Sequence, residues 1–289
     1  MKIINDGLPE PIYRVLQNDQ YDPGESDYTT SSLNQPPYQR QLFRELGDQL
    51  TENASDKIWA LLGSSVHYVI ELAGEKIANY EAEHRYYGTV STLFGDKKIG
   101  AQVDLLDTSS LTIYDMKCTS VYSAMGEPKD EWVQQLNVQR WCIWKHAGKV
   151  VNSLNIVGIW RDWSKSKVVT SHDYPRQQCS IIEIPIWTFE QTEDWIRGRV
   201  TLHEEAKIET SANTTTCSDE ETWAKPTKWA AKKEGSSRAT KLFDDEEPAV
   251  AFANSKGLVV EERPGERTRC KNYCPASNLC PAYQQFLNN

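Results

Sequence analysis

The chain has 289 residues, of which 39% are hydrophobic, and it carries a formal net charge of −9. This length and apolar content suffice for one large domain, or for a core domain with a smaller appendage. The acidic balance argues against a protein that coats nucleic acid by bulk electrostatics, although it is compatible with an enzyme that has a basic groove.

The apolar runs and the N-terminus argue against a membrane or secreted protein. The longest apolar runs, residues 154–160 and 181–187, are far shorter than the roughly 20 residues that cross a bilayer. The first residues, MKIINDGLPEP, lack the charged start, apolar stretch and cleavage site of a secretory signal. We therefore expect a cytoplasmic protein without membrane contact, in which the seven cysteines are reduced thiols or metal ligands.

The N-terminal part of the chain changes from irregular to helical. Residues 1–56 are polar, with turn signals near Asp22 and Gln35 and a short helical pattern over 38–50, and we expect them to cap a core. Apolar residues then recur at helical spacing over 55–83, which predicts one long helix with a buried face.

The period changes after this helix. Three segments alternate like strands and are separated by turn signals, which predicts three consecutive antiparallel strands, namely residues 84–94, 98–106 and 110–118. We then expect a helix over residues 130–146 and a strand over residues 153–160. A turn at 164–167, a strand over 179–187 and a helix over 190–206 should follow. This order predicts a mixed α/β core. Because the composition shifts after Glu209, we expect a cap at 1–56, a core at 57–209 and an appended segment at 210–289.

Two carboxylates and a lysine mark the strand pair. We expect the pair to bring Asp104 and Asp115 together, and Lys117 shares a sheet face with Asp115 because strand side chains alternate. Oxygen ligands on neighbouring strands suit Mg²⁺ or Mn²⁺, which activate water and stabilise a phosphorane-like transition state. Lys117 would then orient or deprotonate that water, or neutralise the scissile phosphate. Alone, an Asp-x-Lys segment is more often a solvent-exposed turn.

The flanking helices add further polar groups. His67 and Glu71 lie one turn apart in the segment GSSVHYVIE, although a helical histidine on an apolar face is usually a satisfied core residue. Gln135 lies on the next helix, from which it can reach back toward Lys117. Four segments in this order resemble the motifs of the PD-(D/E)XK nuclease superfamily. They are GxxxHxxxE, the segment from Gly100 to Asp104, Asp-Met-Lys and the glutamine. The resemblance is to the branch with the RecB and AddB nuclease domains and the CRISPR-associated adaptation exonucleases.

The resemblance implies a fold, a metal site and an activity. It implies a restriction-endonuclease-like mixed sheet flanked by helices, with Lys117 catalytic, Gln135 supporting it and Glu71 behind the metal ligands. The metal ligands that it implies are His67, Asp104, Asp115 and the backbone carbonyl of Met116. The chain departs from the family at Gln139, where a tyrosine is common. The alternative is a core that keeps this fold without activity.

The C-terminal tail contains three cysteines within eleven residues, at positions 270, 274 and 280. This spacing suits ligands of one soft metal centre better than burial as apolar side chains. In the related nucleases such a trio joins an N-terminal cysteine around an iron–sulfur cluster, but here proline occupies that place near Pro36. We expect Cys217 to be the fourth ligand beside Cys270, Cys274 and Cys280.

The identity of this second centre is open from the sequence, because four thiolates accept either a 4Fe-4S cluster or Zn²⁺. The resemblance favours the cluster, with the structural role of holding a C-terminal cysteine-bound metal subdomain onto the core. Cys118 borders the strand with Lys117, whereas Cys142 and Cys179 lie in apolar patterns and are interpreted as packing residues.

A basic and aromatic stretch follows the core. Lysines interleaved with tryptophans can bind phosphates and stack on the bases of a single strand. An equally good interpretation is a solvated hairpin whose tryptophans cover a small core. The residues proposed for DNA contact, with two arginines near the start of the core, are Arg40, Arg44, Trp223, Lys228, Trp229, Lys232 and Lys233.

These observations predict a Mg²⁺- or Mn²⁺-dependent exonuclease that hydrolyses DNA at ends or single strands in recombination, repair or replication. Recombination or replication proteins would be its partners. If the chain is phage-encoded, its compartment is the host cytoplasm. The alternative is a non-catalytic DNA-binding or scaffolding module of a recombination complex.

Overall fold

The computed structural model describes residues 1–18 and 22–288, which form two compact units. The first unit comprises Met1–Gln35 and Thr51–Thr210, and the second comprises Pro36–Leu50 and Ser211–Asn289. The expected cap over residues 1–56 is therefore divided between the two units. The shift in composition after Glu209 falls at the boundary between Thr210 and Ser211.

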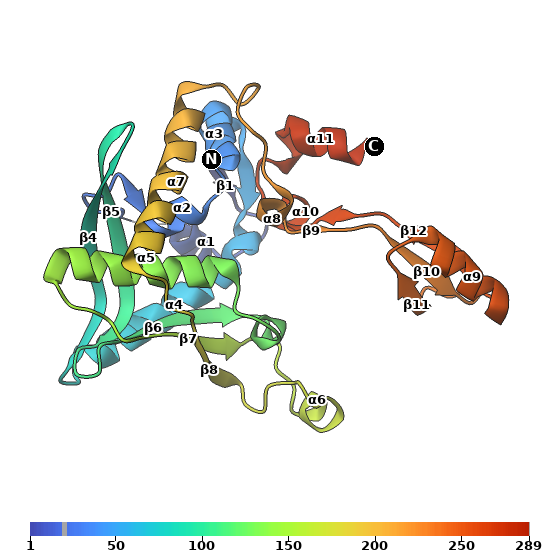
Figure 1. The fold of residues 1–289 in the computed structure, drawn as a ribbon, viewed down its shortest axis with the longest axis horizontal. Coiled ribbons are helices and arrows are strands. Elements are labelled where there is room, and N and C mark those ends of the chain that lie inside the picture. Colours follow the sequence, from blue (N-terminus) through green and yellow to red (C-terminus); the bar gives the residue numbers. More distant parts are fainter. Residues whose placement is uncertain (19–21, 289) are drawn as a thin grey trace. The chain divides into compact units, whose positions relative to one another are not determined.

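The first unit is built on a mixed six-stranded sheet, which confirms the mixed α/β expectation (Figure 1). Its strands run in the order β2-β5-β6-β7-β8, and β4 also pairs with β5. The three consecutive strands β4, β5 and β6 are antiparallel as expected, whereas β6 and β7 are parallel. The strands are β2 (Tyr28–Thr29), β4 (Tyr80–Thr92), β5 (Gly95–Asp107), β6 (Thr112–Thr119), β7 (Ser153–Trp160) and β8 (Cys179–Glu183).

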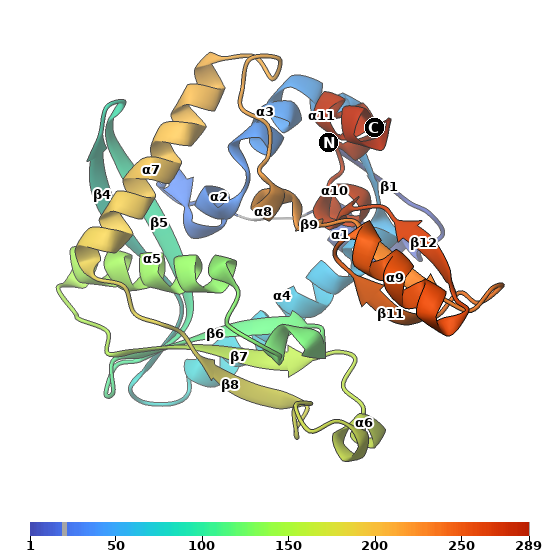
Figure 2. The same ribbon diagram turned by 45° about the vertical axis from the view of Figure 1, so that its right-hand side comes forward.

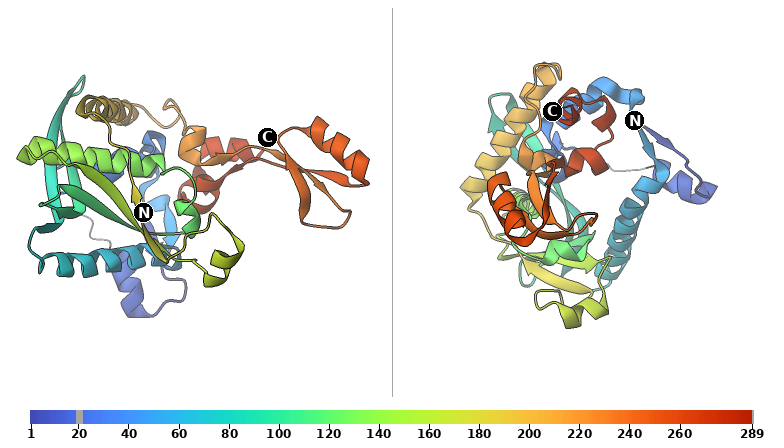
Figure 3. Two further views of the ribbon diagram at one scale, coloured as in Figure 1. Left: turned by 60° about the horizontal axis from the view of Figure 1, so that its bottom comes forward. Right: turned by 90° about the vertical axis from the view of Figure 1, so that its right-hand side faces the viewer.

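Helices flank this sheet. Two of them, α4 (Ile58–Gly74) and α5 (Asp130–Ala147), lie on opposite sides of it (Figure 3, left). α5 connects the parallel strands β6 and β7, and α7 (Phe189–Ile208) begins at a capping box between Thr188 and Gln191. Trp141 of α5 is fully buried in the main core. The core therefore fixes α5 against the strands that carry the predicted site.

The predicted helix over residues 55–83 is too long. α4 ends at Gly74, and residues from Tyr80 onward belong to β4. A Cβ atom at Gly74 would lie 2.8 Å from the Cβ of Ala82, so the glycine permits the close passage of strand and helix. The expected buried face is only half-buried where α4 contacts the sheet, and Gly74 is the one buried residue of α4. Trp59, for example, is 58% exposed.

Two smaller expectations also fail. The segment predicted as a turn over residues 164–167 opens the short helix α6 (Lys165–Thr170). Cys179 is exposed rather than packed, because it is the first residue of the edge strand β8. The remaining elements of the first unit are β1 (Lys2–Ile4), α1 (Glu10–Gln17), α2 (Thr30–Asn34), β3 (Thr51–Asn53), η2 (Ala54–Lys57) and η3 (Val121–Ala124). Within residues 1–18 and 22–288, no helix has both the length and the apolar character to cross a membrane.

The second unit joins a helix from early in the chain to the C-terminal residues. α3 (Pro37–Leu46) is held to the later segment by Glu45, whose Oε1 accepts a hydrogen bond from the Ser211 amide at 2.7 Å. Strands β10, β11 and β12 form a small antiparallel sheet on which α9 packs (Figure 2). The elements are η1 (Gly47–Gln49), α8 (Asp219–Thr222), β9 (Ala224–Lys225), β10 (Lys228–Lys232), β11 (Ala239–Phe243), α9 (Glu246–Lys256), β12 (Val259–Arg263), β13 (Glu266–Arg267), α10 (Thr268–Tyr273), η4 (Ser277–Leu279) and α11 (Pro281–Leu287).

Candidate functional site

Asp104 lies where the sheet departs from regular pairing. The register of β4 with β5 sets Glu83 opposite Asp104, between two regularly paired positions. The register of β5 with β6, continued by one residue, sets Asp115 opposite Asp104 on the other side. The Oδ2 atom of Asp104 accepts a hydrogen bond from the Met116 amide at 2.7 Å. Three acidic side chains therefore come together around one position on β5.

Glu83 has an unusual backbone and a tightly held side chain. Its φ of 48° is in the left-handed region, which residues with a Cβ rarely adopt. Its Oε1 lies 3.0 Å from Nδ1 of His67, and its Oε2 accepts a hydrogen bond from Gln102 at 2.5 Å. The same Nδ1 atom is 3.5 Å from Oδ2 of Asp104.

His67, Glu83 and Asp104 form a compact set of potential metal ligands. Each offers one donor atom, and these atoms all lie within 4.8 Å of one another. Within the part of the chain that the structure describes, no other group of three His, Cys, Asp or Glu residues comes this close together. One imidazole nitrogen and two carboxylate oxygens suit a divalent cation such as Mn²⁺ or Mg²⁺.

Asp115 is fully buried beside this group, and both of its oxygens are engaged. Oδ1 accepts hydrogen bonds from Gln135 at 2.7 Å and from Gln139 at 3.2 Å. Oδ2 lies 2.5 Å from Nζ of Lys117. Gln139, the departure from the family pattern, also donates to the backbone carbonyl of Gln102 at 3.1 Å. Side chains from α5 therefore fix the orientation of Asp115.

The electrostatics of the site are those of crowded, buried carboxylates. Burial, together with the charge of Asp115, raises the pKa of Asp104 to about 7, although Lys117 and His67 oppose the shift. The hydrogen bond that His67 donates to Glu83 is the main cause that raises the pKa of His67. Burial lowers the pKa of Lys117, but Asp115 and Asp104 outweigh it and the net shift is upward. A further positive charge would relieve the repulsion that Asp104 experiences.

The structure brings most of the predicted site residues together. His67 and Asp104 lie within one ligand group, and Asp115 lies with Lys117 and Gln135. Glu71 is not part of either group. Its side chain is half-buried and makes no hydrogen bond or ion pair with the described residues.

Sequence reasoning missed Glu83, because the predicted helix was continued to that residue. A signal was present in the turn residues Gly74 and Asn79. Ending the helix there and starting the strand at Tyr80 sets Glu83 opposite Asp104 in the antiparallel register.

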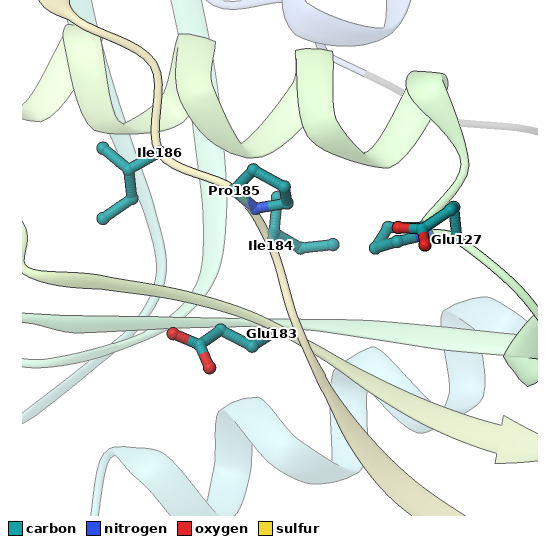
Figure 4. A pocket seen from close by; sticks show the side chains of 6 residues that line it. Glu127, Glu183, Ile184, Pro185 and Ile186 are labelled. Atoms are coloured by element: carbon teal, nitrogen blue, oxygen red, sulfur yellow. The ribbon is translucent and has the colours of Figure 1, made fainter.

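A separate hollow of about 460 Å³ lies away from these residues. Figure 4 shows it between the start of the α5 segment and the end of β8, lined by Glu127, Pro128, Glu183, Ile184, Pro185 and Ile186. It includes none of the residues of the ligand group. The described residues that line it include no cationic side chain, so we assign it no role.

The four cysteines expected to bind a second centre gather in the second unit. Cys217, Cys270, Cys274 and Cys280 pack into one cluster with apolar residues of α3 and α11. Burial, together with nearby Glu221 and the other three cysteines, raises the pKa of Cys217 to about 12. Cys142 is fully buried in the first unit, as interpreted, and Cys118 is half-buried.

Two residues at the start of α3 donate hydrogen bonds to this cluster. The buried Tyr38 hydroxyl bonds to the sulfur of Cys280, and burial together with that contact raises the pKa of Tyr38 to about 12. Nε2 of Gln39 lies 3.4 Å from the sulfur of Cys274. The N-terminal segment near Pro36 thus contacts the cysteines through hydrogen-bond donors, although it contributes no cysteine.

The residues proposed for DNA contact are partly engaged within the second unit. Lys228 pairs with Asp244, and Lys232 pairs with Glu261. The ring of Trp223 packs 5.3 Å from that of Tyr273. The other four are half-buried or exposed, namely Arg40, Arg44, Trp229 and Lys233. These contacts are those of a solvated hairpin over a small core, and a role of these residues in DNA binding stays a prediction.

Comparison with known proteins gives little further guidance. No protein-family model matches the chain, and no curated protein matches it. The chain is similar to a solved structure described as "Crystal structure of SSO0001", with 16% sequence identity and a TM-score of 0.48. The similarity covers 67% of this chain and 85% of the other. A functional assignment therefore depends on the site itself.

Proposed function

We propose that the chain is a Mg²⁺- or Mn²⁺-dependent deoxyribonuclease of the PD-(D/E)XK type, which acts as an exonuclease on DNA ends or single strands. One observation carries the proposal. The ligand group of His67, Glu83 and Asp104 lies beside the ion pair between the buried Asp115 and the half-buried Lys117. Metal-assisted phosphodiester hydrolysis requires a cation site next to groups that handle water and phosphate charge.

The donor set fits a divalent cation. His67, Asp104 and Asp115, with the Met116 carbonyl, would hold it. The raised pKa of Asp104 supports this assignment, because a buried carboxylate next to a second carboxylate is stabilised by a positive charge. When bound, such a cation would polarise the scissile phosphodiester and favour ionisation of water.

Glu83 is assigned the role of orienting His67. Its Oε1 lies 3.0 Å from Nδ1 of His67, and its Oε2 accepts a hydrogen bond from Gln102. Metal-binding histidines commonly donate their other ring N–H to a carboxylate in this way.

Lys117 is assigned to the phosphate. Because Asp115 and Asp104 raise its pKa, its ammonium form prevails. This favours neutralisation of charge on the scissile phosphate over deprotonation of water. Gln135 and Gln139 hold Asp115, and through it they keep Lys117 in position.

The test is incubation of the purified protein with end-labelled single- and double-stranded DNA, with Mn²⁺ or with EDTA. We expect degradation with Mn²⁺, loss of degradation in EDTA, and loss in Lys117→Ala. Lys149→Ala is the matched control, because Lys149 also forms an ion pair, with Glu81 at 3.0 Å. Equal degradation by the wild type and Lys117→Ala would contradict the mechanism. Absence of degradation by either would favour the non-catalytic scaffold.

We further propose that Cys217, Cys270, Cys274 and Cys280 hold a 4Fe-4S cluster, or alternatively Zn²⁺, that stabilises the second unit. The support is their common cluster and the two hydrogen bonds that reach it from α3. An absorbance band at about 400 nm in anaerobically purified protein identifies the cluster, and bound zinc without it identifies the alternative. Cys217→Ser should lower the metal content, whereas Cys179→Ser, an exposed cysteine of the first unit, should leave it unchanged.

A further inference from the structure

An edge of exposed aromatic rings and cations borders the candidate site. Trp59 and Tyr122 are 58% and 57% exposed, respectively. The guanidinium of Arg161 lies 4.2 Å from the ring centroid of Trp59. Nζ of Lys167 lies 5.3 Å from the ring centroid of Tyr122 and donates a hydrogen bond to its hydroxyl at 3.0 Å. We refer to these four residues as the aromatic–basic edge.

This edge continues directly from the residues of the site. Tyr122 follows Lys117 by five residues, just beyond the end of β6. Arg161 follows the parallel strand β7, and its amide donates to the carbonyl of Thr119, the last residue of β6, at 2.9 Å. Trp59 precedes His67 on α4 by eight residues, a rise of about 12 Å. Figure 2 shows the start of α4 and the ends of β6 and β7 on the same side of the first unit.

The loop that carries Tyr122 is fixed by burial of its neighbour and by hydrogen bonds to Asp162. Val121, the neighbour of Tyr122, is fully buried, and its amide donates to Asp162 at 2.7 Å. The other oxygen of Asp162 accepts a hydrogen bond from Ser120 at 2.8 Å. The carboxylate beside Arg161 is therefore engaged in fixing the loop. Rings held in place present contact area at a small entropic cost.

We propose that the aromatic–basic edge binds a single strand of DNA and leads it to Lys117. Bases would stack on Trp59 and Tyr122, and phosphates would lie beside Arg161 and Lys167. Exposed aromatic rings alternating with cations are suited to unpaired bases, because in a duplex the faces of the bases are already stacked on their neighbours. The inference rests on the proposed nuclease function, since it supplies that site with a substrate path.

The first experiment measures binding without cleavage. Fluorescence anisotropy of a labelled oligothymidylate in EDTA gives Kd for the full chain. We expect Trp59→Ala and Tyr122→Ala each to raise Kd by about 5- to 150-fold, the range for loss of one stacked base. Trp59→Phe should retain most of the affinity. Tyr68→Ala is the matched control, because Tyr68 is 60% exposed on the same helix.

The second experiment tests the cations. Each phosphate contact to a single strand contributes about 0.7 to the slope of log K against log salt concentration. Arg161→Gln and Lys167→Gln should each reduce that slope by about 0.7. Lys76→Gln, an exposed lysine just beyond the far end of α4, should leave the slope unchanged.

Two results would overturn the inference: binding by Trp59→Ala and Tyr122→Ala that equals that of Tyr68→Ala, or a preference of the wild type for duplex DNA. Because binding is measured in EDTA, it is independent of cleavage. If the protein degrades DNA but shows either result, only the proposed role of the aromatic–basic edge is refuted. A protein that binds through the edge but never degrades DNA refutes the proposed nuclease function.

Discussion

The contact between Glu83 and His67 makes a quantitative prediction about metal binding. Glu83→Gln keeps the shape of the side chain but removes the charge that Nδ1 of His67 faces at 3.0 Å. Substitution of such a carboxylate partner typically costs 10- to 100-fold in metal affinity. Because Gln can still accept one hydrogen bond, we expect a loss near the lower limit, about tenfold, in Mn²⁺ affinity measured by titration calorimetry.

A double-mutant cycle separates orientation of His67 from direct contact with the ion. If Glu83 acts through His67, Glu83→Gln should change Mn²⁺ affinity by less than about twofold in a His67→Ala background. The same tenfold loss in both backgrounds would refute the reasoning, because it would mean that Glu83 binds the ion independently. Electron paramagnetic resonance of bound Mn²⁺ in the four proteins checks that the ion occupies the same site.

Three further predictions concern buried polar groups. Gln139→Leu removes two hydrogen bonds in the core, one of them to Asp115. It should lower the free energy of unfolding, measured by urea titration, by about 1–3 kcal/mol. An unchanged urea midpoint would contradict the role of Gln139. If the second centre is an iron–sulfur cluster, Tyr38→Phe and Gln39→Leu each remove a hydrogen bond to a cysteine sulfur. Each variant should lower the reduction potential measured by spectroelectrochemical titration. An unshifted potential in either variant would count against the hydrogen bond that it removes. In EDTA, the raised pKa of Asp104 makes the folded state retain a proton that the unfolded state releases, so thermal stability should fall as pH rises from about 4 to about 7. Asp104→Asn should flatten that profile, and a profile identical to that of the wild type would contradict the shift.

The residues that strand alternation links directly could be predicted from the sequence. Asp104, Asp115 and Lys117 lie on segments whose alternation and turns define the strands, so the antiparallel pairing brings them together. Glu83 was missed, because the apolar spacing of α4 continues past its end and outweighs the turn signals at Gly74 and Asn79. The helix ends where β4 passes within contact distance of Gly74, and that is a tertiary constraint.

The second unit shows a different limit. The spacing of the C-terminal cysteines and the polar setting of Cys217 nominated four residues that pack into one apolar cluster, and their role as metal ligands stays a prediction. The contribution of α3 was not evident, because hydrogen bonds from Tyr38 and Gln39 to sulfur leave no pattern in the sequence. Sequence reasoning therefore assigned residues 36–50 to a cap, whereas they belong with Ser211–Asn289.

The second unit is built from two segments that lie far apart in the chain, and this constrains the order of folding events during synthesis. Pro36–Leu50 leaves the ribosome before all of Thr51–Thr210, yet the cysteines that it contacts follow that entire segment. At typical elongation rates, α3 waits on the order of 10 s for its partners, with the apolar face that includes Leu42 unpaired. The first unit can fold during this interval, whereas the second closes a long loop only after the last cysteine emerges. If the cysteines hold the proposed metal centre, metal acquisition would be the final step of maturation. A shortage of iron or zinc would then leave a folded first unit attached to an unassembled second one.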